Sequence, residues 1–152
     1  MACAIGTPDA PYSPPPLNVD VKDVFDTEKA IMREAVQSGP VVILGRAAFW
    51  VLRDEPALLS VFLLAPIEKR AKRAMKVYGL GFLEEARELV ERTDNERNRF
   101  VKAVTGKEHM NLLNYNLCVD TGCLGIGMAI ELIYQAAMEV SKDLARKREG
   151  LL

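Results

Sequence analysis

The stretch Pro40-Val-Val-Ile-Leu-Gly45-Arg46 decides the fold of this chain. Its four central residues form an unbroken apolar run, rich in β-branched side chains, between a proline and a glycine. Such a run is typical of a strand buried on both faces in a parallel sheet. Residues 60–64 form a second run of this kind, and residues 116–120 are a third candidate strand. We therefore expect three short strands in a parallel sheet.

Helical patterns separate the candidate strands. Asp26 or Thr27 can cap a first helix that ends near residue 37. The apolar positions of this helix include Ala30, Ile31, Ala35 and Val36. Pro66 suits the first turn of another helix. The other predicted helices cover residues 47–53, residues 83–104 and a final segment that reaches residue 147. Strands that alternate with helices predict an α/β fold.

Composition narrows the class of protein. The chain has 152 residues, enough for one domain with a sizeable core. Its 20 basic and 21 acidic residues nearly balance, which argues against bulk electrostatic binding of nucleic acid or a membrane surface. No unbroken apolar run approaches the roughly 18 residues of a membrane span. The N-terminus lacks the basic flank of a signal peptide. We therefore expect a cytoplasmic protein without a nucleic-acid or membrane partner, and a homo-oligomer remains open.

Proline divides the chain into two parts. Residues 7–16 contain five of the eight prolines, which favour an extended conformation without backbone donors. We therefore expect an extended N-terminal arm over residues 1–25 and an α/β domain over residues 26–152. The three prolines at residues 14–16 could also dock into an aromatic groove of a partner, although an arm laid over the domain is the simpler interpretation.

Candidate binding residues follow the strands, because ligands of open parallel sheets lie beyond the carboxyl ends of the strands. Gly45 allows a ligand to approach the backbone, and Arg46 supplies donors suited to a phosphate. Arg70 and Arg73 share one side of the next helix, beside the Gly-Leu-Gly segment at residues 79–81. They form either an exposed helix face or a cationic clamp that closes over phosphates.

A third polar group lies on the long charged helix. Asp94 and Arg97 share one side of this helix, where they form either a surface ion pair or a nucleotide contact. His109 has no neighbouring nucleophile, so we expect a polar loop role for it. Cys118 and Cys123 lack a second pair of ligands, so no metal site is expected, because zinc usually needs four ligands.

In this order, the motifs resemble the cytidylate-kinase-like family of nucleoside monophosphate kinases, from about residue 26 to residue 147. The resemblance implies a three-layer, P-loop-kinase-like parallel sheet flanked by helices. It implies ATP-dependent phosphorylation of CMP or dCMP, with ATP and Mg as cofactors. It also implies that Gly45, Arg46, Asp94 and Arg97 bind the nucleoside monophosphate. Arg70 and Arg73 then correspond to the catalytic lid arginines.

The chain departs from the family pattern in two places. Ala47 stands where cytidylate kinases in the narrow sense carry aspartate. No Gly-x-x-x-x-Gly-Lys-Ser/Thr pattern occurs in the 152 residues, so no site for ATP and Mg is evident. We therefore expect the first strand and the P-loop to be missing or replaced, and residues 2–5 are one candidate to fill the vacant position in the sheet.

Three interpretations of function follow from this loss. The chain is a kinase impaired by the absence of the loop, a non-catalytic nucleotide-binding or protein-interaction module, or an incomplete gene product. The sequence leaves open whether the chain is an enzyme at all.

Overall fold

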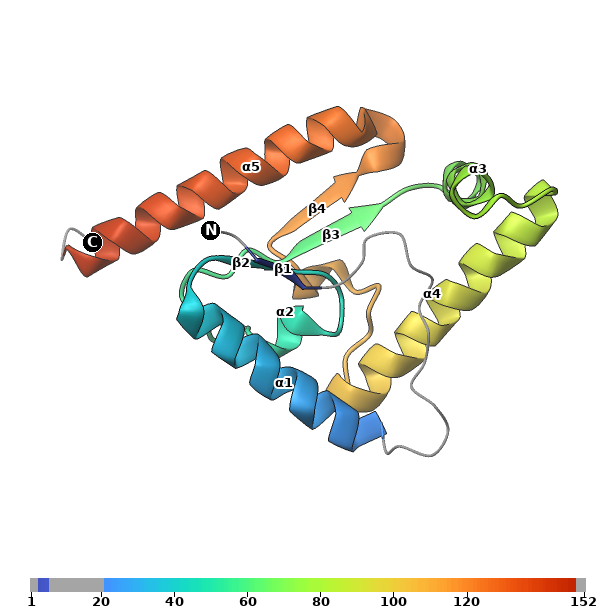
Figure 1. Cartoon of the computed structure of the whole chain (residues 1–152). Coiled ribbons are helices and arrows are strands. Elements are labelled where there is room, and N and C mark those ends of the chain that lie inside the picture. The colour runs from blue at the N-terminus through green and yellow to red at the C-terminus, as the bar shows by residue number, and fades with distance from the viewer. Residues whose placement is uncertain (1–2, 6–20, 150–152) are drawn as a thin grey trace.

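The structure of the chain is a computed structural model that describes residues 3–5 and 21–149 (Figure 1). The elements are, in chain order, β1 (Cys3–Ile5), α1 (Val21–Ser38), β2 (Val41–Ile43), α2 (Ala48–Val51), β3 (Val61–Leu64), α3 (Ile67–Tyr78), α4 (Leu83–Thr105), a 3-10 turn (Leu112–Asn114), β4 (Leu117–Asp120) and α5 (Thr121–Arg148). Strands alternate with helices, which confirms the mixed α/β prediction. Most of the proline-rich arm lies outside the described residues.

All strand pairs are parallel. In the first ladder, β1 pairs with β2, with Cys3 opposite Val41. In the second, β3 pairs with β4, with Val61 opposite Leu117. Within the described residues these are two separate two-stranded sheets, so the predicted three-layer arrangement around one sheet is not established. The apolar residues near the N-terminus do form a strand, but it pairs only with β2 among the described strands.

The strands are less buried than their sequences predict. Phe62 is buried, whereas Val42 on β2 and Leu63 on β3 are 54% and 53% exposed. Successive side chains of a strand point to opposite faces, so one face of each strand is open. The prediction that these runs are buried on both faces is therefore wrong. An apolar run in the sequence does not show which face of the strand is buried. The packing of the helices determines which face is covered.

Helix α1 begins at Val21, ahead of the caps that the sequence predicts at Asp26 or Thr27. Thr27 lies inside the helix, where its hydroxyl donates to the Asp23 carbonyl oxygen at 3.1 Å, so it is not a cap. Phe25 packs edge to face against Phe100 with a centroid distance of 5.9 Å, and Met32 continues the buried side. Ile31, predicted to be on the apolar side, is half exposed. The contact with Phe100 therefore determines which face of α1 is buried.

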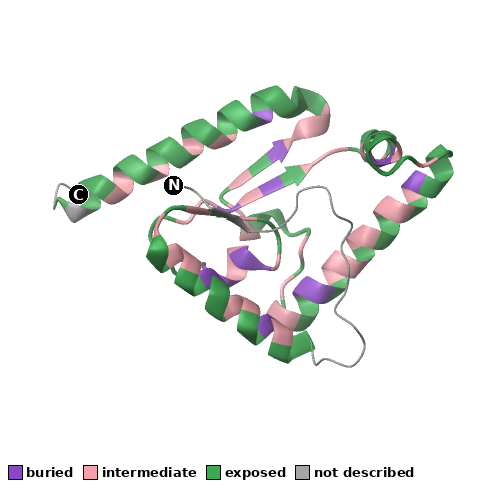
Figure 2. Ribbon diagram, viewed as in Figure 1, coloured by how far each residue is buried: buried purple, intermediate pink, exposed green. Residues whose placement is uncertain are grey.

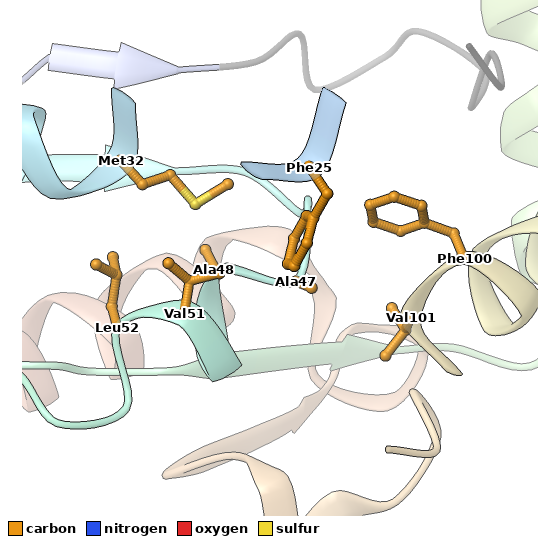
Figure 3. Packing of buried hydrophobic residues seen from close by; sticks show 8 residues of the cluster. All are labelled: Phe25, Met32, Ala47, Ala48, Val51, Leu52, Phe100 and Val101. Carbon is orange, nitrogen blue, oxygen red and sulfur yellow. The ribbon is translucent and has the colours of Figure 1, made fainter. Parts of the chain in front are cut away.

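The main core lies where α1, α2 and α4 meet (Figure 3). Its buried members are Phe25, Met32, Ala47, Ala48, Val51, Leu52, Phe100 and Val101. A second, smaller core joins α3 to α4 through Ala71, Ala74 and Ala86. Small side chains allow these two helices to approach closely, and Arg87 links them with an ion pair to Glu68 at 3.0 Å. The α3–α4 hairpin is thus held in a defined position.

Helix α5 begins at the end of β4 and packs against β3 and β4 (Figure 1). The Asp120 carboxylate caps it by accepting hydrogen bonds from the Gly122 and Cys123 amides at 2.8 and 3.1 Å. Gly125 interrupts the helix with a φ of 79°. Most of the helix surface is exposed, as Figure 2 shows. Other parts of the chain therefore cover little of the surface of α5.

Helix α5 bears on the predicted absence of a membrane partner. Residues Thr121–Lys147 form a helix that is long and apolar enough to cross a membrane by length and composition, with a mean hydropathy of 1.4 over the relevant window. The sequence predicts this helix, but a count of unbroken apolar runs does not mark it as a possible span, because charged residues such as Glu131 interrupt the run. Length and composition alone are weak indications, so the absence of a membrane partner remains a prediction.

Candidate functional site

A cavity of about 140 Å³ opens at the carboxyl end of β3. It lies between the end of this strand, the α3–α4 hairpin and the loop that precedes β4. Charged side chains of the two helices form one wall, and Phe62 and His109 form part of another. This is the edge of a parallel sheet at which ligands are expected.

The charged wall is organised around Asp94. Its Oδ2 atom accepts a hydrogen bond from Arg70 Nη1 at 2.6 Å, and its Oδ1 atom accepts from Arg97 Nη1 at 3.4 Å. Arg70 Nε also donates to the Ala65 carbonyl oxygen at 3.0 Å, which orients the guanidinium relative to the end of β3. Two guanidinium groups therefore share one carboxylate. The excess positive charge and the further N–H donors of each arginine suit a bound anion such as a phosphate.

The second wall is neutral. The ring of His109 lies 5.4 Å from that of Phe62, and the Tyr115 hydroxyl lies 3.0 Å from His109 Nδ1. Burial lowers the pKa of His109 to about 4, and the positive charge of Arg97 adds to this effect. Burial also raises the pKa of Tyr115 to about 12. Both groups are uncharged at neutral pH, so this wall suits a flat, neutral ring.

Arg46 lies apart from this cavity. Its backbone has a φ of 53°, and Gly45 and Ala47 on either side are also left-handed. Its guanidinium donates to the Glu28 carboxylate of α1 and lies over the ring of Phe100 at 4.6 Å. The described cavity lining includes neither Gly45 nor Arg46. In this state, Arg46 is paired with a carboxylate next to the main core.

The two predicted catalytic arginines also separate. Arg70 points to Asp94 and lines the cavity, whereas Arg73 lies on the exposed side of α3 and outside the described lining. A spacing of three residues places the two side chains on one side of a helix but rotates them by about 60°. With this difference in direction, Arg70 forms an ion pair with Asp94 of α4, whereas Arg73 is exposed. The structure thus brings together Arg70, Asp94 and Arg97 of the predicted set.

Sequence reasoning missed the neutral wall. His109 does lie in a loop, but it is half-buried there against Phe62 of β3. Phe62 also packs against Tyr115 at 4.9 Å, and Phe49 extends this aromatic group at 5.0 Å from Tyr115. Nothing in the local sequence links these residues, because Phe62 and His109 are far apart along the chain. The aromatic character of the loop before β4 was the one available signal.

The residues that follow β4 make contacts within the fold. Thr121 Oγ1 donates to the Leu64 carbonyl oxygen at 3.1 Å, which ties the end of β4 to the end of β3. A Cβ atom at Gly122 would lie 2.5 Å from Pro66 Cδ, so α5 and the start of α3 are in close contact there. Among residues 3–5 and 21–149, no group of three or more His, Cys, Asp or Glu side chains could hold a metal ion. Cys118 and Cys123 are both exposed free thiols.

Residues 18–122 match the model of a family described as the cytidylate kinase-like family. A cytidylate kinase from Methanopyrus kandleri is 35% identical over 97 residues, which cover 59% of this chain and 50% of that protein. A cytidylate kinase from Pyrobaculum neutrophilum is 34% identical over 115 residues, which cover 76% of this chain and 60% of that protein. The matches therefore span between half and three fifths of the length of these curated relatives.

A solved structure shares the fold. The crystal structure of an uncharacterized protein from Eubacterium ventriosum matches with a TM-score of 0.72 and 22% sequence identity. The match covers 80% of this chain and 69% of that one. At this identity the similarity concerns the fold alone.

Proposed function

The chain belongs to the cytidylate kinase-like family, and we propose that its cavity binds a pyrimidine nucleoside monophosphate, CMP or dCMP. The observation that carries this proposal is the pairing of the Arg70–Asp94–Arg97 wall with the neutral wall of Phe62 and His109. All of these residues lie within the part of the chain that matches the family. A nucleotide has the same two parts, an anionic phosphate and a flat, neutral base.

The arginines supply what phosphoryl transfer requires of a protein. The transferring group spreads negative charge over its oxygens, so catalysis depends mainly on positioning and on positive charge. Asp94 holds Arg70 and Arg97 in place, and their remaining N–H groups would bind the phosphate of the acceptor. Arg46 and Arg73 keep the roles that the family resemblance implies for them, with Arg46 exchanging Glu28 for a phosphate oxygen when the nucleotide binds.

The residues present do not fit a site for ATP and Mg. The 152 residues contain no Gly-x-x-x-x-Gly-Lys-Ser/Thr pattern, and the described part of the chain has no acidic cluster that could hold a metal ion. The proposed function is therefore acceptor binding. Phosphorylation of the bound nucleotide is the reaction of the family, and no step of it is assigned to this chain.

Calorimetric titration of the purified chain with CMP tests the proposal. We expect binding of CMP and a loss of at least about tenfold in affinity, or 1.4 kcal/mol, in Arg97→Ala. Arg92→Ala is the matched control, because Arg92 lies exposed on the same helix and outside the described cavity lining. A folded chain that does not bind CMP, or equal effects of the two variants, would contradict the proposal.

Titration with ATP and Mg then separates the two remaining interpretations of function. If the chain binds CMP but not ATP, it is a nucleotide-binding module without a donor site. If it binds both, formation of CDP should be measured at once, since the chain then has a donor site other than a Gly-x-x-x-x-Gly-Lys-Ser/Thr loop. Arg46→Ala should weaken CMP binding in either case, and an unchanged affinity would remove Arg46 from the site.

A further inference from the structure

Aromatic neighbours hold the ring of His109 in one orientation. The ring lies edge to face against Phe62 at 5.4 Å and against Tyr115 at 6.3 Å. The Tyr115 hydroxyl lies 3.0 Å from His109 Nδ1. His109 lines the cavity, whereas Tyr115 is outside the described lining. The Nδ1 edge of the ring therefore faces Tyr115, and Nε2 is the ring nitrogen that remains for a ligand.

The Tyr115 hydroxyl also determines which ring nitrogen carries the proton. Burial lowers the pKa of His109 to about 4, so the ring is neutral at pH 7 and has one N–H group. Tyr115 donates its single proton to the His109 carbonyl oxygen at 3.1 Å, so its oxygen can accept from Nδ1–H. In the other tautomer Tyr115 would have to donate to Nδ1, and the nearby carbonyl oxygen would lose its donor. The proton is therefore on Nδ1, and Nε2 is an acceptor.

Among the described side chains of the cavity, this acceptor is not yet used. Arg70 and Arg97 carry donors only, and both carboxylate oxygens of Asp94 already accept hydrogen bonds from these arginines. The Ala65 carbonyl oxygen accepts from Arg70 Nε. No hydrogen bond joins His109 Nε2 to the part of the chain that the structure describes. A ligand group that meets this nitrogen should therefore supply a donor.

We propose that His109 selects the base of the bound nucleotide, because its Nε2 atom accepts a hydrogen bond from the 4-amino group of cytosine. This inference rests on the proposed function, which places the phosphate on the arginines and the base against the neutral wall. In the same pose uracil presents a carbonyl oxygen, so two acceptors would face each other. A partly buried polar group without its partner is costly, and a site built around such a hydrogen bond rejects the analogue that lacks it.

Calorimetric titration with matched nucleotides tests the inference. The ligands are CMP, UMP and the monophosphate of 2-pyrimidinone riboside, which lacks only the 4-amino group of CMP. We expect the wild-type chain to bind CMP at least about tenfold more tightly than either of the others. His109→Phe keeps an aromatic ring against Phe62 but has no acceptor, so most of this preference should disappear.

Tyr115→Phe is a second variant, which keeps the ring of Tyr115 and the whole side chain of His109. Without the hydroxyl, the proton of the imidazole can move to Nε2, which then donates to the carbonyl oxygen of uracil. The ratio of the CMP and UMP affinities should therefore fall in this variant as well. A purely structural role of Tyr115 would weaken both nucleotides alike and leave the ratio unchanged.

Arg97→Ala is the matched control, because loss of a phosphate contact should weaken the three nucleotides by the same factor. Circular dichroism checks that each variant is folded. If Arg97→Ala weakens CMP binding but the preference for CMP persists in His109→Phe, the role of His109 is overturned and the proposed function stands. The same holds if the wild-type chain binds CMP and UMP equally well. A folded chain that binds none of the nucleotides would contradict the proposed function and this inference together.

Discussion

The charge of His109 is determined by its surroundings. Its imidazole packs against Phe62 and lies within hydrogen-bond distance of the Tyr115 hydroxyl. Burial, followed by the nearby Arg97 cation, lowers its pKa to about 4, and the Asp94 carboxylate opposes this effect. The residue is therefore neutral beside two arginines, which keeps one wall of the cavity free of charge.

This pKa predicts a loss of stability in mild acid. The unfolded histidine binds a proton near pH 6.5, whereas the folded one does so only near pH 4. Between these values the unfolded state binds more protons, so the free energy of unfolding falls as the pH falls. We expect a contribution of about 1–3 kcal/mol after solvent screening. Urea unfolding of wild type and His109→Gln, at neutral pH and near pH 4, measures it.

Carboxylates also titrate in acid, so the effect of His109 must be separated from theirs. The test compares how much the free energy of unfolding falls between the two pH values in the wild type and in His109→Gln. His109→Gln removes ring packing and therefore costs stability at both pH values. Its loss between the two should nevertheless be smaller than that of the wild type. Equal losses would show that the pKa of His109 is not lowered in the folded protein.

At the scale of elements, the α3–α4 hairpin positions the charged wall. Ala71 and Ala86 are fully buried where the two helices touch. Gly79 ends α3 in a left-handed conformation, with a φ of 66° that glycine adopts without strain. This turn reverses the chain so that Arg70 of α3 meets Asp94 of α4. The ion pair of the site therefore depends on close helix packing.

A larger side chain at this contact should disturb both stability and binding. In Ala86→Leu the extra atoms have no space between α3 and α4, so we expect the free energy of unfolding to fall by about 1–3 kcal/mol. The affinity for CMP should fall as well, because Arg70 moves relative to Asp94. Ala103→Leu, at an exposed position of α4, is the control. Thermal unfolding temperatures that match between the two variants would contradict the packing argument.

At the scale of the whole molecule, the N-terminal strand joins two distant parts of the chain. Cys3–Ile5 pairs in parallel with Val41–Ile43, with α1 between the two strands in sequence. The core of α1, α2 and α4 lies next to this ladder, as Figure 1 shows. The cavity lies at the end of β3, which belongs to the other ladder. The N-terminal residues are therefore expected to support the core more than the cavity.

Hydrogen exchange tests this arrangement. The ladder amides of residues 3–5 and 41–43 should exchange slowly, because backbone hydrogen bonds protect them. Deletion of residues 1–5 should accelerate exchange in residues 41–43 and leave residues 61–64 unchanged, as measured by mass spectrometry. Unprotected amides at residues 3–5 in the full chain would show that the β1–β2 ladder does not form in solution.

Local sequence determined where most elements lie. Pro66 precedes α3 as its N-cap, and Gly106 ends α4 in a left-handed conformation. The predicted second and third strands agree with β3 and β4 to within one residue at each end. These features depend on backbone preferences and on neighbours a few residues away, which the sequence states directly. For the same reason, the ordered motifs were enough to indicate the family.

Only the tertiary structure decided which faces are buried and which side chains meet. Phe25 of α1 packs against Phe100 of α4, and the position of the helices left Leu63 exposed. The cavity joins Arg70 and Asp94 to His109, whereas Arg46 pairs with Glu28 instead. Each of these outcomes depends on contacts between segments that are distant in sequence. Backbone propensity and spacing carry no information about such contacts, since they arise from packing of the folded chain.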